Sequence, residues 1–351
     1  MLLYIHIPFC DSKCSYCAFN TYVDKFHLKQ EYMNALLIQL EFELKRFRAT
    51  EKSIETVFIG GGTPSTLDAQ RYKPLFAMIR PYLKENIEIT SEANPNSATR
   101  EWLEGMHSLG VNRISFGVQS FNDTKLKLLH RAHNSESARI AIQNATDIGY
   151  KNLSLDLIYA VQGDTKALLQ HDIETAFSLN INHISAYALT IEEGTLFQKT
   201  PQMAEEKLEL TRWLFESIHK KGFKQYEISN FGSYQSEHNI GYWHYKDYIG
   251  LGCGAVGFLN DRRFYPSTSL EHYLKNPLDI HEEVLSKDAI KIEKIFLGLR
   301  SHVGVLHTIL NTTERRQADL LVKEKKLTCK DNTYYNKNYL LSDELALFIT
   351  A

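Results

Sequence analysis

The chain has 351 residues, of which 43% are hydrophobic and 23% are charged, and its formal net charge is −2. This composition is typical of an ordinary soluble globular protein and excludes a strongly basic surface, so no nucleic-acid partner is expected. The length exceeds the roughly 250–300 residues at which a single hydrophobic core usually stops growing. One large domain and a smaller one are therefore expected.

Cysteine content and apolar patterning indicate the cellular compartment. No apolar stretch reaches the ~18 residues of a transmembrane helix, and the first residues lack the basic start and the small-residue cleavage site of a signal peptide. Five cysteines, three of them packed closely together, favour a metal site in a reducing compartment over a disulfide framework. The sequence therefore predicts a cytoplasmic protein with thiolate chemistry near its N-terminus.

Short apolar runs alternate with stretches of 3.6-residue periodicity, so strands and helices are expected to alternate. The predicted strands are residues 2–7, 56–59, 86–91, 113–118, 152–158, 183–187 and 225–228. Repeated βα units form a parallel sheet, so we expect an α/β fold with a partial (β/α) barrel of the TIM type over residues 1–260. Later helical patterns and two β-rich pieces around Asp331 and Asn332 predict a small C-terminal domain with a hairpin, residues 261–351.

One face of the central predicted strands is polar. Successive side chains of a strand point to opposite faces, and the polar face carries Glu88, Thr90, Glu92, Arg113, Ser115, Gln119, Ser154 and Asp156. An ordinary eight-stranded barrel fills its interior with aliphatic residues, because unpaired buried carboxylates cost several kcal/mol each. We therefore expect a polar ligand or water inside the barrel. An open sheet with one solvated face is the alternative, although parallel sheets are normally covered on both sides.

Three cysteines follow the first predicted strand with the spacing Cys-x3-Cys-x2-Cys: Cys10, Cys14 and Cys17. A [4Fe–4S] cube takes one ligand per iron, so three cysteines leave one iron free to chelate a small molecule. A tetrahedral zinc site would need a fourth protein ligand, and Cys253 and Cys329 lie far along the chain. The spacing favours a cluster, with zinc or a redox role as alternatives.

A glycine-rich turn, Gly60-Gly61-Gly62-Thr63, ends the second predicted strand. Glycines let the backbone approach a ligand closely, and the sequence is not a P-loop because the Gly-Lys-[Ser/Thr] ending is absent. Taken alone, the turn is equally compatible with an ordinary βα loop.

The cysteine spacing, with aromatic Tyr16 before the last cysteine, resembles the radical S-adenosylmethionine (SAM) superfamily, whose members cleave SAM reductively. Motifs over nearly the whole chain are similar to the branch that contains oxygen-independent coproporphyrinogen III oxidase and the heme chaperone HemW: residues 4–10, 17–20, 60–65, 117–120 and 155–158. The resemblance implies a [4Fe–4S] cluster on the three cysteines. It also implies SAM contacts from Tyr4, Tyr16, Gly61, Gly62, Thr63, Glu92, Gln119, Arg131 and Asp156.

Two departures within this branch argue against the oxidase. The oxidase carries a further cysteine two residues after the cluster motif, where this chain has Phe19, and an N-terminal extension, whereas this chain begins nine residues before Cys10. Residues 238–255 instead resemble the heme-binding region of the chaperones. There His238 offers an imidazole, and Tyr242 and Trp243 offer flat apolar faces to a porphyrin. The alternative is that these three residues only pack and hydrogen-bond.

The resemblance therefore implies a chaperone whose cargo is heme. Its implied partners are heme-accepting apoproteins, such as membrane cytochromes, and an electron donor, and its implied location is cytoplasmic and at most peripheral to the membrane. One alternative is the oxidase reaction, in which a 5′-deoxyadenosyl radical starts the decarboxylation of coproporphyrinogen. A zinc-bound binding module without radical chemistry is the other.

Overall fold

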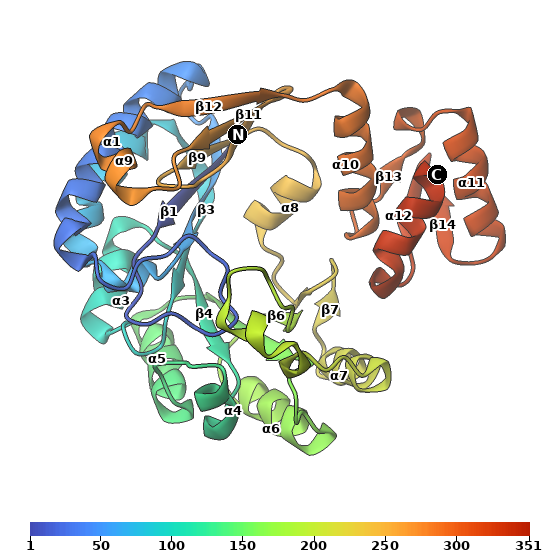
Figure 1. The fold of residues 1–351 in the computed structure, drawn as a ribbon, viewed down its shortest axis with the longest axis horizontal. Coiled ribbons are helices and arrows are strands. Elements are labelled where there is room, and N and C mark those ends of the chain that lie inside the picture. The colour runs from blue at the N-terminus through green and yellow to red at the C-terminus, as the bar shows by residue number, and fades with distance from the viewer.

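Six strands lie side by side in chain order and all run parallel in the computed structural model, which describes residues 1–351. They are β1 (Leu2–Ile7), β2 (Ile54–Gly61), β3 (Leu83–Ala93), β4 (Arg113–Gln119), β5 (Asn152–Tyr159) and β6 (His183–Ala188). The helices between and after them are α1 (Lys29–Arg46), α2 (Lys73–Ile79), α3 (Arg100–Leu109), α4 (Asp123–Leu128), α5 (Ser135–Ile148), α6 (Lys166–Phe177) and α7 (Leu208–Lys220). The sheet curves but does not close, so the predicted partial (β/α) barrel is confirmed (Figure 1).

Local sequence signals account for the ends of the outer helices. The Thr99 side chain caps α3 by accepting a hydrogen bond from the Trp102 amide, and α3 ends at Gly110, whose φ is 105°. Helix α5 begins with a capping box between Asn134 and Ser137 and ends at Gly149, also with φ of 105°. These caps fix the residues at which each helix begins and at which the chain leaves it for the next strand.

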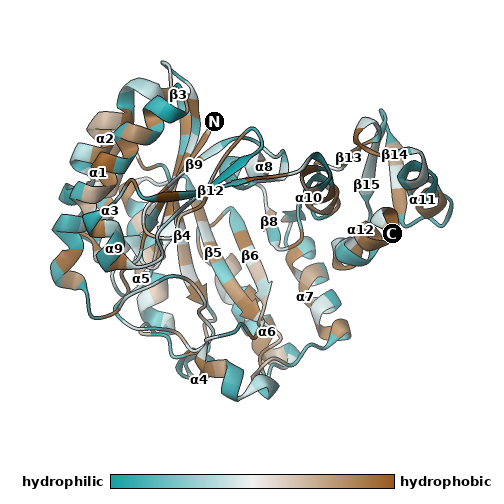
Figure 2. Ribbon diagram, turned by 45° about the horizontal axis from the view of Figure 1, so that its top comes forward, coloured by the Kyte–Doolittle hydropathy of each residue, from teal (hydrophilic) through white to brown (hydrophobic).

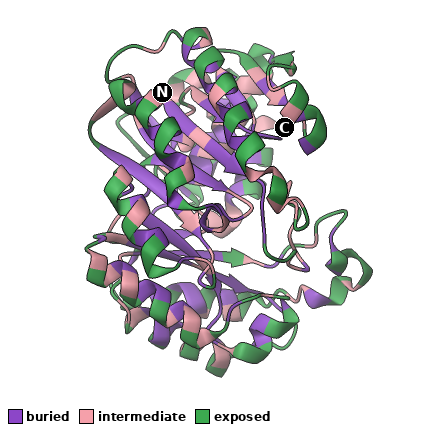
Figure 3. Cartoon of the chain, turned by 90° about the vertical axis from the view of Figure 1, so that its left-hand side faces the viewer, coloured by how far each residue is buried: buried purple, intermediate pink, exposed green.

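The predicted division of the strands into an apolar and a polar face is confirmed. The apolar side chains pack under the outer helices in one large core, so the strands are buried and the outer helix faces are exposed (Figure 3). Apolar residues are prominent along β4 (Figure 2). The inward face is polar and is nevertheless shielded from solvent at Glu88, Thr90, Arg113, Ser115 and Ser154. The barrel interior therefore concentrates hydrogen-bonding and charged groups.

The predicted strand at 225–228 is wrong as a further parallel strand. The chain forms two short strands there, β7 (Lys224–Gln225) and β8 (Asn230–Gly232), and β8 runs antiparallel to β6. The backbone between them pairs elsewhere, because the Ile228 amide donates to the Arg300 carbonyl (2.8 Å) and Glu227 bridges to Ser301. The parallel part of the barrel therefore ends at β6.

The other side of the sheet continues beyond residue 260. Strand β9 (Tyr248–Leu251) runs parallel to β1, and β10 (Gly257–Leu259), β11 (Arg262–Pro266) and β12 (Ile280–Val284) follow in antiparallel order, with α9 (Leu270–Lys275) packed on α1. A second hydrophobic core begins only at Ile295. We therefore propose that the boundary between the two domains, expected after residue 260, lies between β12 and the next helix.

The C-terminal unit has its own core and its own three-stranded sheet, and it stands beside the barrel (Figure 1). It comprises α10 (Lys287–Leu299), β13 (Val305–Leu306), α11 (Thr312–Lys323), β14 (Leu327–Lys330), β15 (Thr333–Asn336) and α12 (Ser342–Thr350). The predicted hairpin is confirmed, since β14 and β15 pair antiparallel across Asp331 and Asn332, whose φ values of 50° and 58° suit a tight primed turn. No helix in the protein has the length and apolarity needed to cross a lipid bilayer.

Candidate functional site

The loop after β1 brings the three predicted cluster ligands to one cavity at the carboxyl ends of the strands. Cys10, Cys14 and Cys17 all line this cavity, and none forms a disulfide. The loop is fixed at its base because the Cys10 amide donates to the Tyr22 carbonyl (3.1 Å). We call this space the small cavity.

The three thiols do not form the compact ligand set of a single metal ion in this structure. No three His, Cys, Asp or Glu side chains converge on one point as the ligands of a single metal ion do. A cubane instead binds its thiolates at separate corners, so its ligands can lie farther apart around one cavity. Burial raises the pKa of the Cys10 thiol to about 11, although a 3.3 Å hydrogen bond with the Thr63 hydroxyl opposes this shift. Cys10 would therefore need a positive charge close by, such as a bound metal centre, to stay ionised as a thiolate.

The glycine-rich turn forms a second wall of the small cavity. Gly61 has a φ of 110°, and a Cβ at this position would lie 2.4 Å from the His6 ring. A Cβ at Gly62 would lie 2.9 Å from the Ile7 carbonyl oxygen. Only glycines therefore let the turn lie against β1, which leaves a backbone surface without side chains facing the cavity.

Buried charges of both signs face the small cavity. Glu92 accepts a hydrogen bond from the Gly61 amide (3.1 Å), and burial, reinforced by nearby Asp156, raises its pKa to about 8. Burial also raises the pKa of Asp156 to about 6. Arg131 donates to the Gly117 carbonyl (2.6 Å) and to the Cys14 sulfur (3.2 Å). The cavity thus offers acidic groups to a cationic centre and a guanidinium to a carboxylate.

All of the residues predicted to contact SAM line the small cavity except Tyr4, together with the three cysteines. Tyr4 lines a second cavity instead, where its hydroxyl hydrogen-bonds with His6 Nδ1 (3.0 Å). Five other polar residues of the small cavity had no motif to reveal them; they are Ser12, Lys13, Thr21, Asn94 and Ser115. Ser115 alone has a sequence signal, because it lies on the inward parity of β4.

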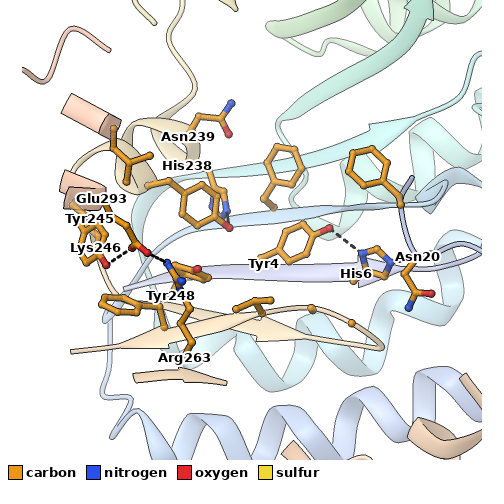
Figure 4. Close-up of a pocket in the computed structure, with 18 of the residues that line it drawn as sticks. Tyr4, His6, Asn20, His238, Asn239, Tyr245, Lys246, Tyr248, Arg263 and Glu293 are labelled. Atoms are coloured by element: carbon orange, nitrogen blue, oxygen red, sulfur yellow. Dashed lines mark hydrogen bonds and ion pairs between the residues drawn. The ribbon is translucent and has the colours of Figure 1, made fainter. Parts of the chain in front are cut away.

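The second cavity is larger, about 800 Å³, and most of its lining residues are hydrophobic. It lies between the sheet, helix α8 (Glu237–Trp243) and helix α10, and we call it the large cavity (Figure 4). Its aromatic walls are Tyr4, Phe19, Phe58, Tyr242, Tyr245, Tyr248, Phe258 and Phe296. The volume falls within the roughly 300–1,000 Å³ of cofactor and small-molecule pockets. Phe19 lines both cavities, so the two sites share a wall.

His238 and Tyr242 line the large cavity, whereas Trp243 does not. Both nitrogens of His238 are engaged, Nδ1 with the Thr56 hydroxyl (2.8 Å) and Nε2 with the Tyr242 hydroxyl (3.0 Å). Burial, followed by the charge of Arg113, lowers the pKa of His238 to about 3, so its imidazole is neutral. A neutral imidazole can bind a metal, but only after Nε2 gives up the Tyr242 hydroxyl.

Glu88 holds the start of α8. Its carboxylate accepts hydrogen bonds from the Glu237 amide (2.9 Å), the His238 amide (3.0 Å) and the Tyr234 hydroxyl (2.7 Å). A carboxylate at a helix N-terminus also interacts favourably with the helix dipole. Glu88 therefore fixes the position of His238 at the start of α8, a role that the sequence pattern did not reveal.

The comparisons with known proteins agree with this geometry. Residues 4–176 match the Radical SAM superfamily. The fold is similar to that of coproporphyrinogen III oxidase (HemN) from Escherichia coli, with a TM-score of 0.83 over 99% of this chain and 89% of that one, at 20% identity. The fold and the cysteine-lined cavity define a radical SAM protein. This class implies a [4Fe–4S] cluster and SAM, and the thiols, the glycine turn and the paired charges fit both.

Full-length relatives narrow the assignment. The chain is 36% identical over 320 residues to the heme chaperone HemW of Bacillus subtilis (strain 168), which covers 86% of this chain and 84% of that protein. It is 38% identical over 282 residues to the heme chaperone HemW of Escherichia coli (strain K12), covering 77% and 74%. The chain belongs to the HemW family.

Proposed function

We propose that this protein is a heme chaperone that holds heme in the large cavity and passes it to apoproteins such as membrane cytochromes. The observation that carries the proposal is the aromatic cavity of about 800 Å³ beside His238 and Tyr242. A porphyrin face buries several hundred Å² of apolar surface, which at about 25 cal/mol/Å² supplies several kcal/mol before ordering costs. The aromatic side chains of this cavity offer that surface.

The small cavity would hold the cluster on Cys10, Cys14 and Cys17, with SAM along Gly61, Gly62 and Thr63. A cluster there supplies electron transfer, and SAM acts as its cofactor or regulator. Glu92 and Asp156 would bind the cationic groups of SAM, and Tyr16 and Gln119 would contribute to the wall of its site. Arg131, already placed by the Gly117 carbonyl, would serve the SAM carboxylate or the thiolate of Cys14. An electron donor to the cluster is part of this proposal.

His238 is the proposed axial ligand of the heme iron. The Thr56 hydroxyl fixes Nδ1, so Nε2 is the nitrogen that would turn from the Tyr242 hydroxyl to the iron. Trp243 would support α8 from outside the cavity, because it follows Tyr242 on the helix and does not line the cavity.

The alternative function is the oxidase reaction on coproporphyrinogen, which the likeness to HemN favours at the level of the fold. Phe19 argues against it, since it stands where the oxidase carries a further cysteine and forms the wall shared by the two cavities. A chaperone needs binding and release of heme and no reactive group at this wall.

Heme titration of the anaerobically reconstituted protein tests the proposal. Wild-type protein should give a Soret band with saturable binding and should transfer heme to an apoprotein. His238→Ala should shift the Soret maximum and change the transfer rate, whereas His219→Ala, on the exposed face of α7, should do neither. Tyr242→Phe, which removes the hydroxyl competing for Nε2, should keep the coordinated spectrum. An unaltered spectrum in His238→Ala would place the iron elsewhere.

A further inference from the structure

The large cavity is chemically different at its two ends. Arg263 and Lys246 line the end where α10 closes the cavity, beside Tyr245 and Glu293 (Figure 4). The opposite end contains His6 and Asn20 and has no cationic side chain (Figure 4). A ligand that is apolar over most of its surface and anionic along one edge would therefore bind in one orientation only.

Both cations are already paired with carboxylates. Arg263, on β11, forms an ion pair with Glu293 on α10 (2.5 Å), and Glu293 also accepts a hydrogen bond from the Tyr245 hydroxyl (2.5 Å). Lys246 forms an ion pair with Glu55 (2.5 Å). These pairs are partly exposed, so each is weak enough to be exchanged for another carboxylate.

The Arg263–Glu293 pair joins the barrel to the C-terminal unit. Arg263 belongs to the large sheet, whereas Glu293, Phe296 and Leu297 are the residues by which α10 closes the cavity. The two units also meet at a backbone seam that does not involve the cavity: the Ile228 amide donates to the Arg300 carbonyl, and the His302 amide donates to the Tyr226 carbonyl, both at 2.8 Å. Loss of the ion pair would therefore loosen α10 over the cavity without detaching the C-terminal unit.

We infer that Arg263 recognises a heme propionate and that its ion pair with Glu293 is a latch that the propionate opens. This inference rests on the proposed function and names the recognition and regulation of the same cavity. Heme carries two propionates on one edge, and Arg263 and Lys246 meet that edge while the rest of the ring lies against the aromatic walls. A propionate on Arg263 displaces Glu293, so loading of heme weakens the closure of α10. The loaded state is thus the one from which heme can leave toward an acceptor.

Paired titrations with heme and heme dimethyl ester test the recognition, because the ester keeps the ring and iron and lacks the carboxylates. Wild-type protein should bind heme about tenfold more tightly than the ester, a difference of about 1.4 kcal/mol. Arg263→Gln should bring the two dissociation constants together without weakening the ester. Glu293→Gln, which removes the competing carboxylate, should tighten heme binding severalfold and leave the ester unchanged.

Arg262→Gln is the matched control. Arg262 is the preceding residue of β11, pairs with Glu282 and does not line the cavity, so this variant should keep the wild-type preference. Equal binding of heme and ester by wild-type protein, or an unchanged preference in Arg263→Gln, would overturn the inference while leaving the heme chaperone proposal standing. Failure of wild-type protein to bind either ligand would instead overturn the proposed function and this inference with it.

Amide hydrogen exchange tests the latch separately from affinity. Saturating heme should speed exchange in α10 relative to the ester-bound protein, and Glu293→Gln should show the faster exchange without any ligand. The seam at Tyr226 and Ile228 should remain protected in every state. Identical exchange in α10 with heme and with ester would contradict a latch.

Discussion

Glu88 should control both the stability of the barrel and the position of the imidazole that faces the large cavity. It is buried at 2% exposure on β3 and accepts four hydrogen bonds from the segment that starts α8. Two reach Oε2, from the Tyr234 hydroxyl and the Glu237 amide, and two reach Oε1, from the Ser236 hydroxyl and the His238 amide. Glu88→Gln keeps the shape but replaces one acceptor oxygen with an amide donor.

The size of the effect follows from these contacts. Whichever oxygen is replaced, one backbone amide loses its acceptor and faces an NH2 group, and one hydroxyl must turn from donating a hydrogen bond to accepting one. A hydrogen bond to a charged group contributes about 1.5–3 kcal/mol, and movement of the start of α8 would recover part of the loss. We expect Glu88→Gln to lower the free energy of unfolding by about 2–4 kcal/mol.

Chemical denaturation followed by circular dichroism measures this change, with Glu85→Gln as the control. Glu85 lies on the same strand, is exposed and pairs only with Lys52, so the control should stay within about 0.5 kcal/mol of wild type. Heme bound to Glu88→Gln should also show a shifted Soret band, because the His238 amide loses its anchor. A Glu88→Gln protein as stable as the control would refute the assignment of Glu88 as the anchor of α8.

Three further predictions concern the small cavity. Cys14→Ser should abolish the oxygen-sensitive visible absorbance of a reconstituted cluster, whereas Cys253→Ser should retain it, and full iron content in Cys14→Ser would contradict the ligand assignment. Asp156→Ala should weaken SAM binding in calorimetric titrations. Leu155→Ala, at a fully buried position, should instead lower the free energy of unfolding by about 2–5 kcal/mol and leave the SAM affinity nearly unchanged. If Asp156→Ala melts early but binds SAM normally, the assignment of Asp156 to the inward face of β5 is wrong. The pKa of Glu92 is raised to about 8, so the ligand-free folded protein holds the proton on Glu92 more tightly than the unfolded chain does. The stability that protonated Glu92 contributes is therefore complete below about pH 4.5 and is lost as the pH rises through about 8. Glu92→Gln should therefore show a smaller fall in melting temperature than wild type between about pH 6 and about pH 9, and an equal fall would contradict the assignment.

The parts of the site that depend on local pattern could be predicted from the sequence. The cysteine loop, the glycine turn and the inward parity of β3, β4 and β5 are each properties of a few consecutive residues, and Glu92 and Asp156 follow from a period of two. The grouping of His238 with Tyr242 also follows, because residues four apart share one face of a helix. Trp243 is one residue farther on and is rotated by about 100° away from that face.

The charged end of the large cavity could not be predicted in the same way. Arg263 lies on a strand that joins the sheet through β9 and β10, and Glu293 comes from a helix with a different core, so their meeting depends on how two units dock. The strand predicted at 225–228 failed for a related reason: its backbone groups bond to residues 300 and 301 in place of a neighbouring parallel strand. Pairings between residues so far apart in the chain produce no periodic pattern of residue types from which they could be predicted.

The most direct test of the chaperone assignment is to offer heme and coproporphyrinogen III side by side to the anaerobically reconstituted protein, with SAM and a reductant present. We expect saturable heme binding and transfer to an apoprotein, with no decarboxylated product from coproporphyrinogen. Formation of protoporphyrinogen at a rate that depends on SAM and on Cys14 would contradict it and would make the large cavity the substrate site of an oxidase.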